Sequence, residues 1–144
     1  MCNIKKLFYI FFTLVFYLSC AYRKEFLIET KIKGGLIGLN EEIIIDNKKI
    51  TYKDKRTKTE ISTQLPGEKI RIFKNLIEKI KTKKDTIGES YPDCIIYEIS
   101  FKIDKKIKKI TFIPDQLYIE SDLHNFVRLL NEIILEIKGE RHEK

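Results

Sequence analysis

Apolar and polar side chains alternate at a period of two residues over much of the first half of the chain. From Phe26 to Ile32 every second position is apolar or threonine, and most positions between them are charged. This pattern predicts a strand with one buried face. It recurs at 42–46 and again around Tyr52, with an Asp-Asn-Lys turn between the two segments. A weaker fourth strand is expected at 59–62.

Two later segments place their apolar residues three or four positions apart, which is the spacing of an amphipathic helix. The first helix is expected to begin at 65–67 and to end by Lys84. The second is expected to run from an N-cap at Ser121 or Asp122 to a C-cap at Gly139. The apolar stripes of the two helices consist of Ile70, Phe73, Leu76, Ile77 and Ile80, and of Leu123, Phe126, Val127, Leu130, Ile133, Ile134 and Ile137.

Two further strands are expected between the helices. A polar connection at 85–93 leads into the clearest strand pattern of the chain, at 95–103, and a turn at 104–106 precedes a return strand at 109–113. The predicted order is therefore β-β-β-α-β-β-α, with one more strand if the weak fourth segment is counted. Because short turns join the strands in pairs, we expect an α+β fold with a mostly antiparallel sheet of five or six strands and both helices on one face.

The N-terminal segment has a different character from the rest of the chain. Two lysines precede a twelve-residue apolar run at 7–18, and small residues follow it. This arrangement is typical of a secretory signal peptide, because a membrane span needs about 20 apolar residues. We therefore expect an exported protein, with residues 1–20 as the signal peptide, 21–139 as a single α+β domain and 140–144 as a disordered tail.

The cleavage site decides whether the exported protein is tethered. The Tyr-Leu-Ser-Cys sequence that ends at Cys20 resembles the lipobox of bacterial lipoproteins, in which the cysteine becomes the lipidated first residue. We favour this interpretation, which predicts a membrane-anchored lipoprotein of the bacterial cell envelope with lipidation at Cys20. Cleavage after Ala21 by an ordinary signal peptidase would instead release a soluble periplasmic or secreted chain that starts at Tyr22. A plain transmembrane anchor is the third alternative.

The cysteines agree with either route of export. Cys2 leaves with the signal peptide, and Cys20 is either lipidated or removed, so Cys94 remains alone and no internal disulfide is expected. Because Cys94 stands at the head of a strand pattern, we expect a buried structural thiol rather than a reactive one.

The charge of the chain is positive, with a formal net value of +7 over 144 residues. The densest basic stretch, at 48–58, favours a solvated strand face, and the alternatives are attraction to an acidic partner or to anionic lipid. Because an exported protein rarely meets nucleic acid, we expect no nucleic-acid partner.

The sequence contains few residues that are suited to catalysis or metal binding. The two histidines are His124, expected on the surface, and His142 in the tail. Neither His124 nor Cys94 has a neighbour at metal-ligand spacing, and no serine stands in a Gly-x-Ser-x-Gly elbow. The glycines at 34–38 do not open a helix, as they would in a dinucleotide-binding fingerprint. We therefore expect a non-enzymatic protein with no catalytic residues, metal or cofactor.

The glycine-rich segment is the strongest candidate for a binding site. Its residues are Gly34, Gly35, Leu36, Ile37, Gly38 and Leu39. Together with the lysine-rich hairpin that follows, this segment resembles the start of the emfourin family, which are small proteinaceous inhibitors of thermolysin-like metalloproteases. The resemblance spans about residues 26–137 and continues at Leu65, at Ser90, Tyr91, Pro92 and Asp93 with Tyr97, and at Leu129 and Leu130. A similar opening is found in small lipoproteins of Bacteroidetes type.

Two functions of different class follow. The first is an exported, non-enzymatic envelope lipoprotein domain with a binding or structural role. The second is an emfourin-like inhibitor whose loop at 34–39 enters the protease cleft, because the resemblance implies a cleft that favours bulky aliphatic residues. A second loop at 90–93 is the weaker candidate contact. An inhibitor needs at least two of Leu36, Ile37 and Leu39 exposed, whereas a purely structural loop would bury them.

Overall fold

A computed structural model describes residues 26–103, 106–117 and 121–139. The predicted signal peptide, the lipidation site at Cys20 and the predicted tail at 140–144 lie outside the described residues. The strands are β1 (Leu27–Gly34), β2 (Leu39–Ile45), β3 (Lys49–Asp54), β4 (Thr59–Gln64), β5 (Thr86–Ile87), β6 (Ile95–Ile103) and β7 (Lys106–Phe112). The helices are α2 (Gly67–Ile80), α3 (Asp122–Gly139) and the short 3-10 helix η1 (Pro114–Gln116).

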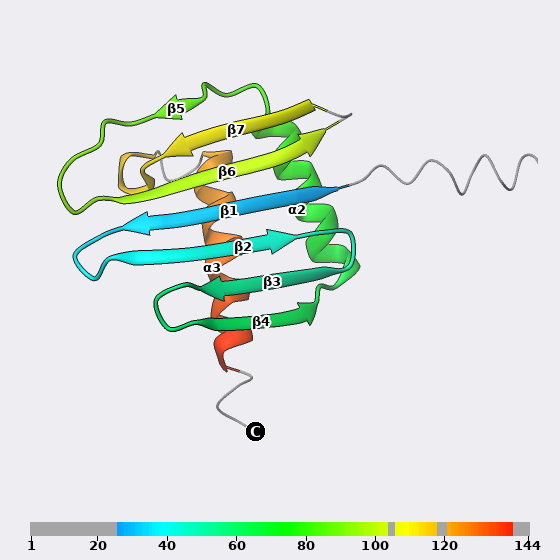
Figure 1. The fold of residues 1–144 in the computed structure, drawn as a ribbon. Coiled ribbons are helices and arrows are strands. Elements are labelled where there is room, and N and C mark those ends of the chain that lie inside the picture. The colour runs from blue at the N-terminus through cyan, green and yellow to red at the C-terminus, as the bar shows by residue number, and fades with distance from the viewer. Residues whose placement is uncertain (1–25, 104–105, 118–120, 140–144) are drawn as a thin grey trace, which may run out of the picture.

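The described strands form one sheet in the order β4-β3-β2-β1-β6-β7-β5. The first strand of the chain lies near the centre of this sheet, between β2 and β6, and it is antiparallel to both. Only the pairing of β5 with β7 is parallel among the described strands. Both α-helices cover the same face of the sheet, and no helix of the described residues lies over the other face (Figure 1). The fold is therefore a two-layer α+β sandwich.

The core lies between the sheet and the two helices. Every second residue of the central strands points toward the helices, and among these Ile28, Ile43 and Ile99 are fully buried. The predicted stripes of both helices are buried against them. Phe73 of α2 and Phe126 of α3 meet edge to face with ring centroids 5.5 Å apart, a favourable geometry for an aromatic pair. The apolar residues at every second position of the strands and at helical spacing in α2 and α3 thus pack into one core.

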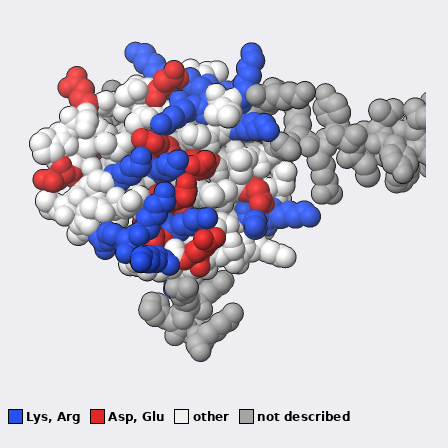
Figure 2. Space-filling view, viewed as in Figure 1, with Lys and Arg blue, Asp and Glu red and all other residues white. Residues whose placement is uncertain are grey.

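The open face of the sheet carries lysines and carboxylates that are interleaved across the strands, and Figure 2 views this face. Lys31 lies directly opposite Glu42 on one side and Glu98 on the other. Glu98 also pairs with Lys33 at 3.6 Å and with Lys109 at 3.2 Å. Partial burial of Glu98 opposes its ionisation, but these ammonium groups outweigh that effect and lower the pKa of Glu98. Much of the charge on this face is therefore paired within the sheet.

The structure confirms the α+β class and the placement of both helices on one face, but the predicted count of five or six strands is wrong. The described sheet has seven strands. The additional strand, β5, lies in the polar connection at 85–93, where it pairs with β7 for two residues. A strand of two residues is too short to produce a period in the sequence. The weak fourth strand is present as β4, and the first helix ends at Ile80, four residues before the predicted limit.

Candidate functional site

Three loops gather at one end of the sheet, which we call the loop end. The β1–β2 loop at 35–38 follows Gly34, whose partner on β6 is Ile95. The loop at 88–94, which leads into β6, therefore lies beside it. The β3–β4 loop at 55–58 lies at the same end, because Asp54 pairs with Glu41 near the start of β2. Figure 1 shows the three loops on the left of the sheet. The two loops predicted as candidate contacts are thus brought together.

The β1–β2 loop is fixed to the loop at 88–94 by backbone contacts. The Gly35 amide donates to the Cys94 carbonyl oxygen at 3.0 Å, and the Gly38 amide donates to the Gly35 carbonyl oxygen at 2.9 Å. Gly34 has a φ of +94°, and a Cβ at this position would lie 2.3 Å from the Cys94 carbonyl oxygen. Glycine is therefore required at position 34, because of both its backbone conformation and the close approach of the Cys94 carbonyl group.

The side chains of the β1–β2 loop divide into an exposed pair and a packed residue. Leu36 is 88% exposed and Ile37 is 66% exposed. Leu39, at the start of β2, packs against the hydrophobic core. Two of the three apolar side chains therefore project from the loop end, the arrangement that a binding loop needs. We refer to Leu36 and Ile37 as the apolar tip.

The β3–β4 loop, which we call the basic loop and define as residues 55–58, supports the apolar tip from one side. The Lys55 amide donates to the carbonyl oxygen of Asn40 at 3.0 Å. The Arg56 guanidinium donates through Nη1 to the carbonyl oxygen of Ile37. The tip is therefore held by a side chain from another hairpin. Sequence reasoning missed this role of Arg56, since the two residues are 19 positions apart and no pattern links them.

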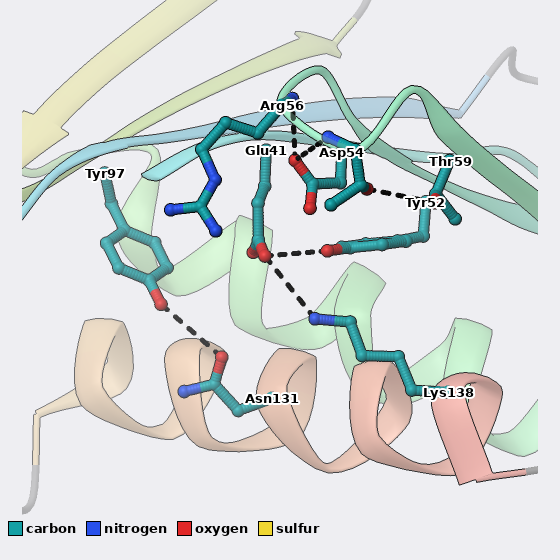
Figure 3. Close-up of polar contacts among 9 residues, drawn as sticks. Glu41, Tyr52, Asp54, Arg56, Thr59, Tyr97, Asn131 and Lys138 are labelled. Carbon is teal, nitrogen blue, oxygen red and sulfur yellow. Dashed lines mark hydrogen bonds and ion pairs between the residues drawn. The ribbon is translucent and has the colours of Figure 1, made fainter. Parts of the chain in front are cut away.

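Asp54 closes the basic loop. Its Oδ1 accepts hydrogen bonds from the Arg56 amide at 2.9 Å and from the Thr57 amide at 3.4 Å, and Figure 3 draws Asp54 beside Arg56. Burial opposes ionisation of this carboxyl, but the amide donors outweigh burial and lower the pKa of Asp54. The ionised form of Asp54 is therefore the form that orders the loop.

Replacement of Asp54 by Ala is expected to lower Tm by about 2–4 °C at pH 6, because a partly exposed carboxylate–amide contact contributes about 0.5–1 kcal/mol. A carboxyl whose pKa is lowered by folding stabilises the fold above its pKa in the unfolded chain, about 3.9. This contribution is lost as the pH falls through the lower pKa that Asp54 has in the folded protein. The Tm difference between wild type and Asp54→Ala should therefore vanish toward pH 2 in thermal denaturation series. A difference that persists unchanged at pH 2 would contradict the assigned role of the ionised form.

A polar cluster behind the apolar tip connects the sheet to α3. Glu41 Oε1 accepts a hydrogen bond from the Tyr52 hydroxyl at 2.7 Å and lies 3.4 Å from the Lys138 ammonium. Lys138 also lies over the Tyr52 ring, 4.5 Å from its centroid. Burial and the Glu41 carboxylate together raise the pKa of Tyr52. Figure 3 shows these three side chains converging from β2, β3 and α3. All of them have partners within the fold, so this cluster supports the loop end from beneath.

The loop at 88–94 is fixed to η1 by side-chain contacts. Gln116 forms two hydrogen bonds with the backbone of Glu89, each at 2.8 Å. The Tyr91 hydroxyl donates to Asp115 Oδ2 at 3.2 Å. Cys94 is buried, as the sequence predicts. Of the second predicted contact loop, Ser90, Tyr91, Pro92 and Asp93 are exposed.

Metal binding and membrane crossing have no candidate in the described parts of the chain. No group of three or more His, Cys, Asp or Glu side chains within residues 26–103, 106–117 and 121–139 is placed to hold a metal ion. In the same residues, neither long helix combines the length and hydrophobicity that crossing a membrane requires. No protein-family model matches this chain, and no curated protein sequence matches it.

Proposed function

We propose that this protein is a non-enzymatic binding domain of the cell envelope, and that the apolar tip is its principal contact. The observation that supports the proposal is the exposure of Leu36 and Ile37 on a loop whose backbone is tied down on two sides. Large aliphatic side chains that project from a braced loop stay in contact with water and are not buried within the fold. They gain that burial when a partner covers them.

The bracing also reduces the entropic cost of binding. A free loop must be ordered when it binds, and this ordering opposes association. Here the Cys94 carbonyl and the Arg56 guanidinium already fix the loop on either side of the tip. Full burial of a Leu or Ile side chain contributes about 1.5–3 kcal/mol. Two such residues on a rigid support together contribute about 3–6 kcal/mol to the binding of a partner that offers a complementary apolar pocket.

Within this class, inhibition of a thermolysin-like metalloprotease is the most specific candidate function. The resemblance to the emfourin family implies a protease cleft that favours bulky aliphatic residues, and the tip presents Leu36 and Ile37 outward. The glycines that flank the tip allow its backbone to approach a cleft closely. The tip therefore has the chemistry and the exposure that this mode of inhibition requires.

A titration with a purified thermolysin-like metalloprotease tests this function. The protein is added from substoichiometric amounts to large excess, and hydrolysis of a peptide substrate is followed. We expect activity to fall in proportion to added protein up to one equivalent, with the added protein left intact on a denaturing gel. Full protease activity at large excess, or cleavage of the added protein, would eliminate the inhibitor function.

We further propose that the domain is anchored to the membrane by a lipid on Cys20, after removal of the preceding signal peptide. The apolar run at 7–18 that ends near this cysteine supports the proposal. Each buried methylene of an acyl chain contributes about 0.8 kcal/mol, and two or more chains give stable anchoring. Labelled fatty acid should be incorporated into the wild-type protein in a bacterial host and not into Cys20→Ser. Equal labelling of the two proteins would exclude this site.

A further inference from the structure

The apolar tip lies between two loops of opposite charge. The strand order β3-β2-β1-β6 places the basic loop on the β3 side of the tip and the loop at 88–94 on the β6 side. The three loops therefore follow one another along the same end of the sheet. A partner that covers the tip must also approach the loops on both sides of it.

The side toward β3 is positively charged. The basic loop contributes Lys55, Arg56 and Lys58, and all three are exposed. The nearest carboxyl in the sequence, that of Asp54, accepts hydrogen bonds from the loop amides and lies beneath the loop rather than at its outer surface. Lys55 approaches Glu42 at 3.8 Å, a distance at which an exposed ion pair contributes little. Lys55 and Lys58 thus remain available to a partner, whereas Arg56 also holds the apolar tip.

The side toward β6 carries carboxylates. Glu89, Asp93 and Asp115 are exposed on the loop at 88–94 and on η1. The backbone of Glu89 is held by Gln116, so its position is fixed relative to the sheet. Figure 2 shows the same division, with red side chains at the upper left, blue side chains at the lower left and mainly white surface between them.

From this arrangement, and resting on the proposed function, we infer that the loop end recognises a protein surface of defined polarity. The partner has an apolar pocket for Leu36 and Ile37, with carboxylates where it meets the basic loop and cations where it meets the loop at 88–94. Charges at the rim of an interface act mainly on the rate and orientation of association, whereas the apolar centre determines how slowly the complex dissociates. The polarity of the rim therefore aligns the tip with the pocket before the apolar contact forms.

The inference is tested by association kinetics with a thermolysin-like metalloprotease as the probe. The test variant is Lys55→Gln with Lys58→Gln, which leaves Arg56 and its contact with the tip unchanged. The matched control is Lys83→Gln with Lys84→Gln, which removes the same charge from the connection between α2 and β5, outside the three loops of the loop end (Figure 1). A third variant, Glu89→Gln, removes one carboxylate from the acidic side.

At 50 mM salt we expect the test variant to associate about 10-fold more slowly than wild type, and Glu89→Gln about 2-fold more slowly, with dissociation rates nearly unchanged. The control should associate at close to the wild-type rate. At 500 mM salt the differences should fall below about 2-fold, because screening confines charge interactions to a few ångströms. Equal association rates for test variant and control, or faster association of Glu89→Gln, would overturn the inferred polarity. Absence of any binding by the wild-type protein would overturn the proposed protease partner, and this inference with it.

Discussion

Replacement of Leu36 and Ile37 together by aspartate is expected to weaken inhibition of a thermolysin-like metalloprotease by at least about 100-fold. Central apolar residues of an interface each cost about 2–4 kcal/mol when they are lost, and two carboxylates forced into an apolar pocket add a desolvation cost. The fold should tolerate the change, because exposed substitutions alter stability by about 0.5 kcal/mol or less. We therefore expect Tm to remain within about 3 °C of wild type. Inhibition constants and thermal denaturation measure the two effects.

The matched control for this variant is Ile107→Asp with Leu135→Asp. These residues are 77% and 70% exposed and lie on β7 and α3, outside the three loops of the loop end. The control adds the same charge and removes similar apolar surface, so it should inhibit as wild type does. If the tip variant loses stability as well as inhibition, Leu36 and Ile37 pack within the fold and the tip is structural. If it inhibits as well as wild type, the contact lies elsewhere on the molecule.

The sequence pattern predicted most of the fold because most elements are long enough to repeat their period. The stripe from Leu123 to Ile137 covers four turns of α3, and the alternation through β6 covers nine residues. Element type follows from such patterns without knowledge of neighbours. The two residues of β5 are too few to show a period. The pairing of β5 with β7 depends on contacts that form only in the folded chain, such as the hydrogen bond that the Thr111 amide donates to the Asp85 carbonyl oxygen at 2.8 Å.

The candidate site was predicted only in part, for a related reason. The cluster of glycines identified the β1–β2 loop, because glycine marks positions of unusual backbone conformation or close approach. The contacts that hold this loop could not be predicted, because Gly35 bonds to Cys94 and Ile37 bonds to Arg56, which are far away in the sequence. The basic stretch at 48–58 also appeared uniform. Folding places Lys53 on the open face of the sheet, where it pairs with Glu60 at 3.4 Å, and places residues 55–58 in the basic loop beside the tip.

Replacement of Gly34 by Ala is expected to cause the largest loss of stability from a single methyl group added at the loop end. The new Cβ would lie 2.3 Å from the carbonyl oxygen of Cys94, which is a backbone atom and cannot rotate away. The φ of +94° is also strained for alanine, at a cost of about 1–3 kcal/mol. Relief of the clash requires β1 and β6 to separate, which breaks the hydrogen bond from the Gly35 amide and costs about 1–3 kcal/mol more. We expect a total loss of about 3 kcal/mol or more in urea denaturation.

Two other glycines separate the contributions to this loss. Gly38 has a φ of +63° but has no atom within 4 Å of a new Cβ, so Gly38→Ala tests backbone strain alone. The free energy of unfolding of this variant should fall by about 1–2 kcal/mol. Gly67, at the start of α2, has neither feature, and Gly67→Ala should change stability by less than about 0.5 kcal/mol. If Gly34→Ala loses no more than Gly38→Ala, β1 and β6 tolerate the methyl group and the loop is not held by close approach to Cys94. If the expected order is observed, the clash with β6 accounts for the difference, and the apolar tip is positioned by the sheet itself.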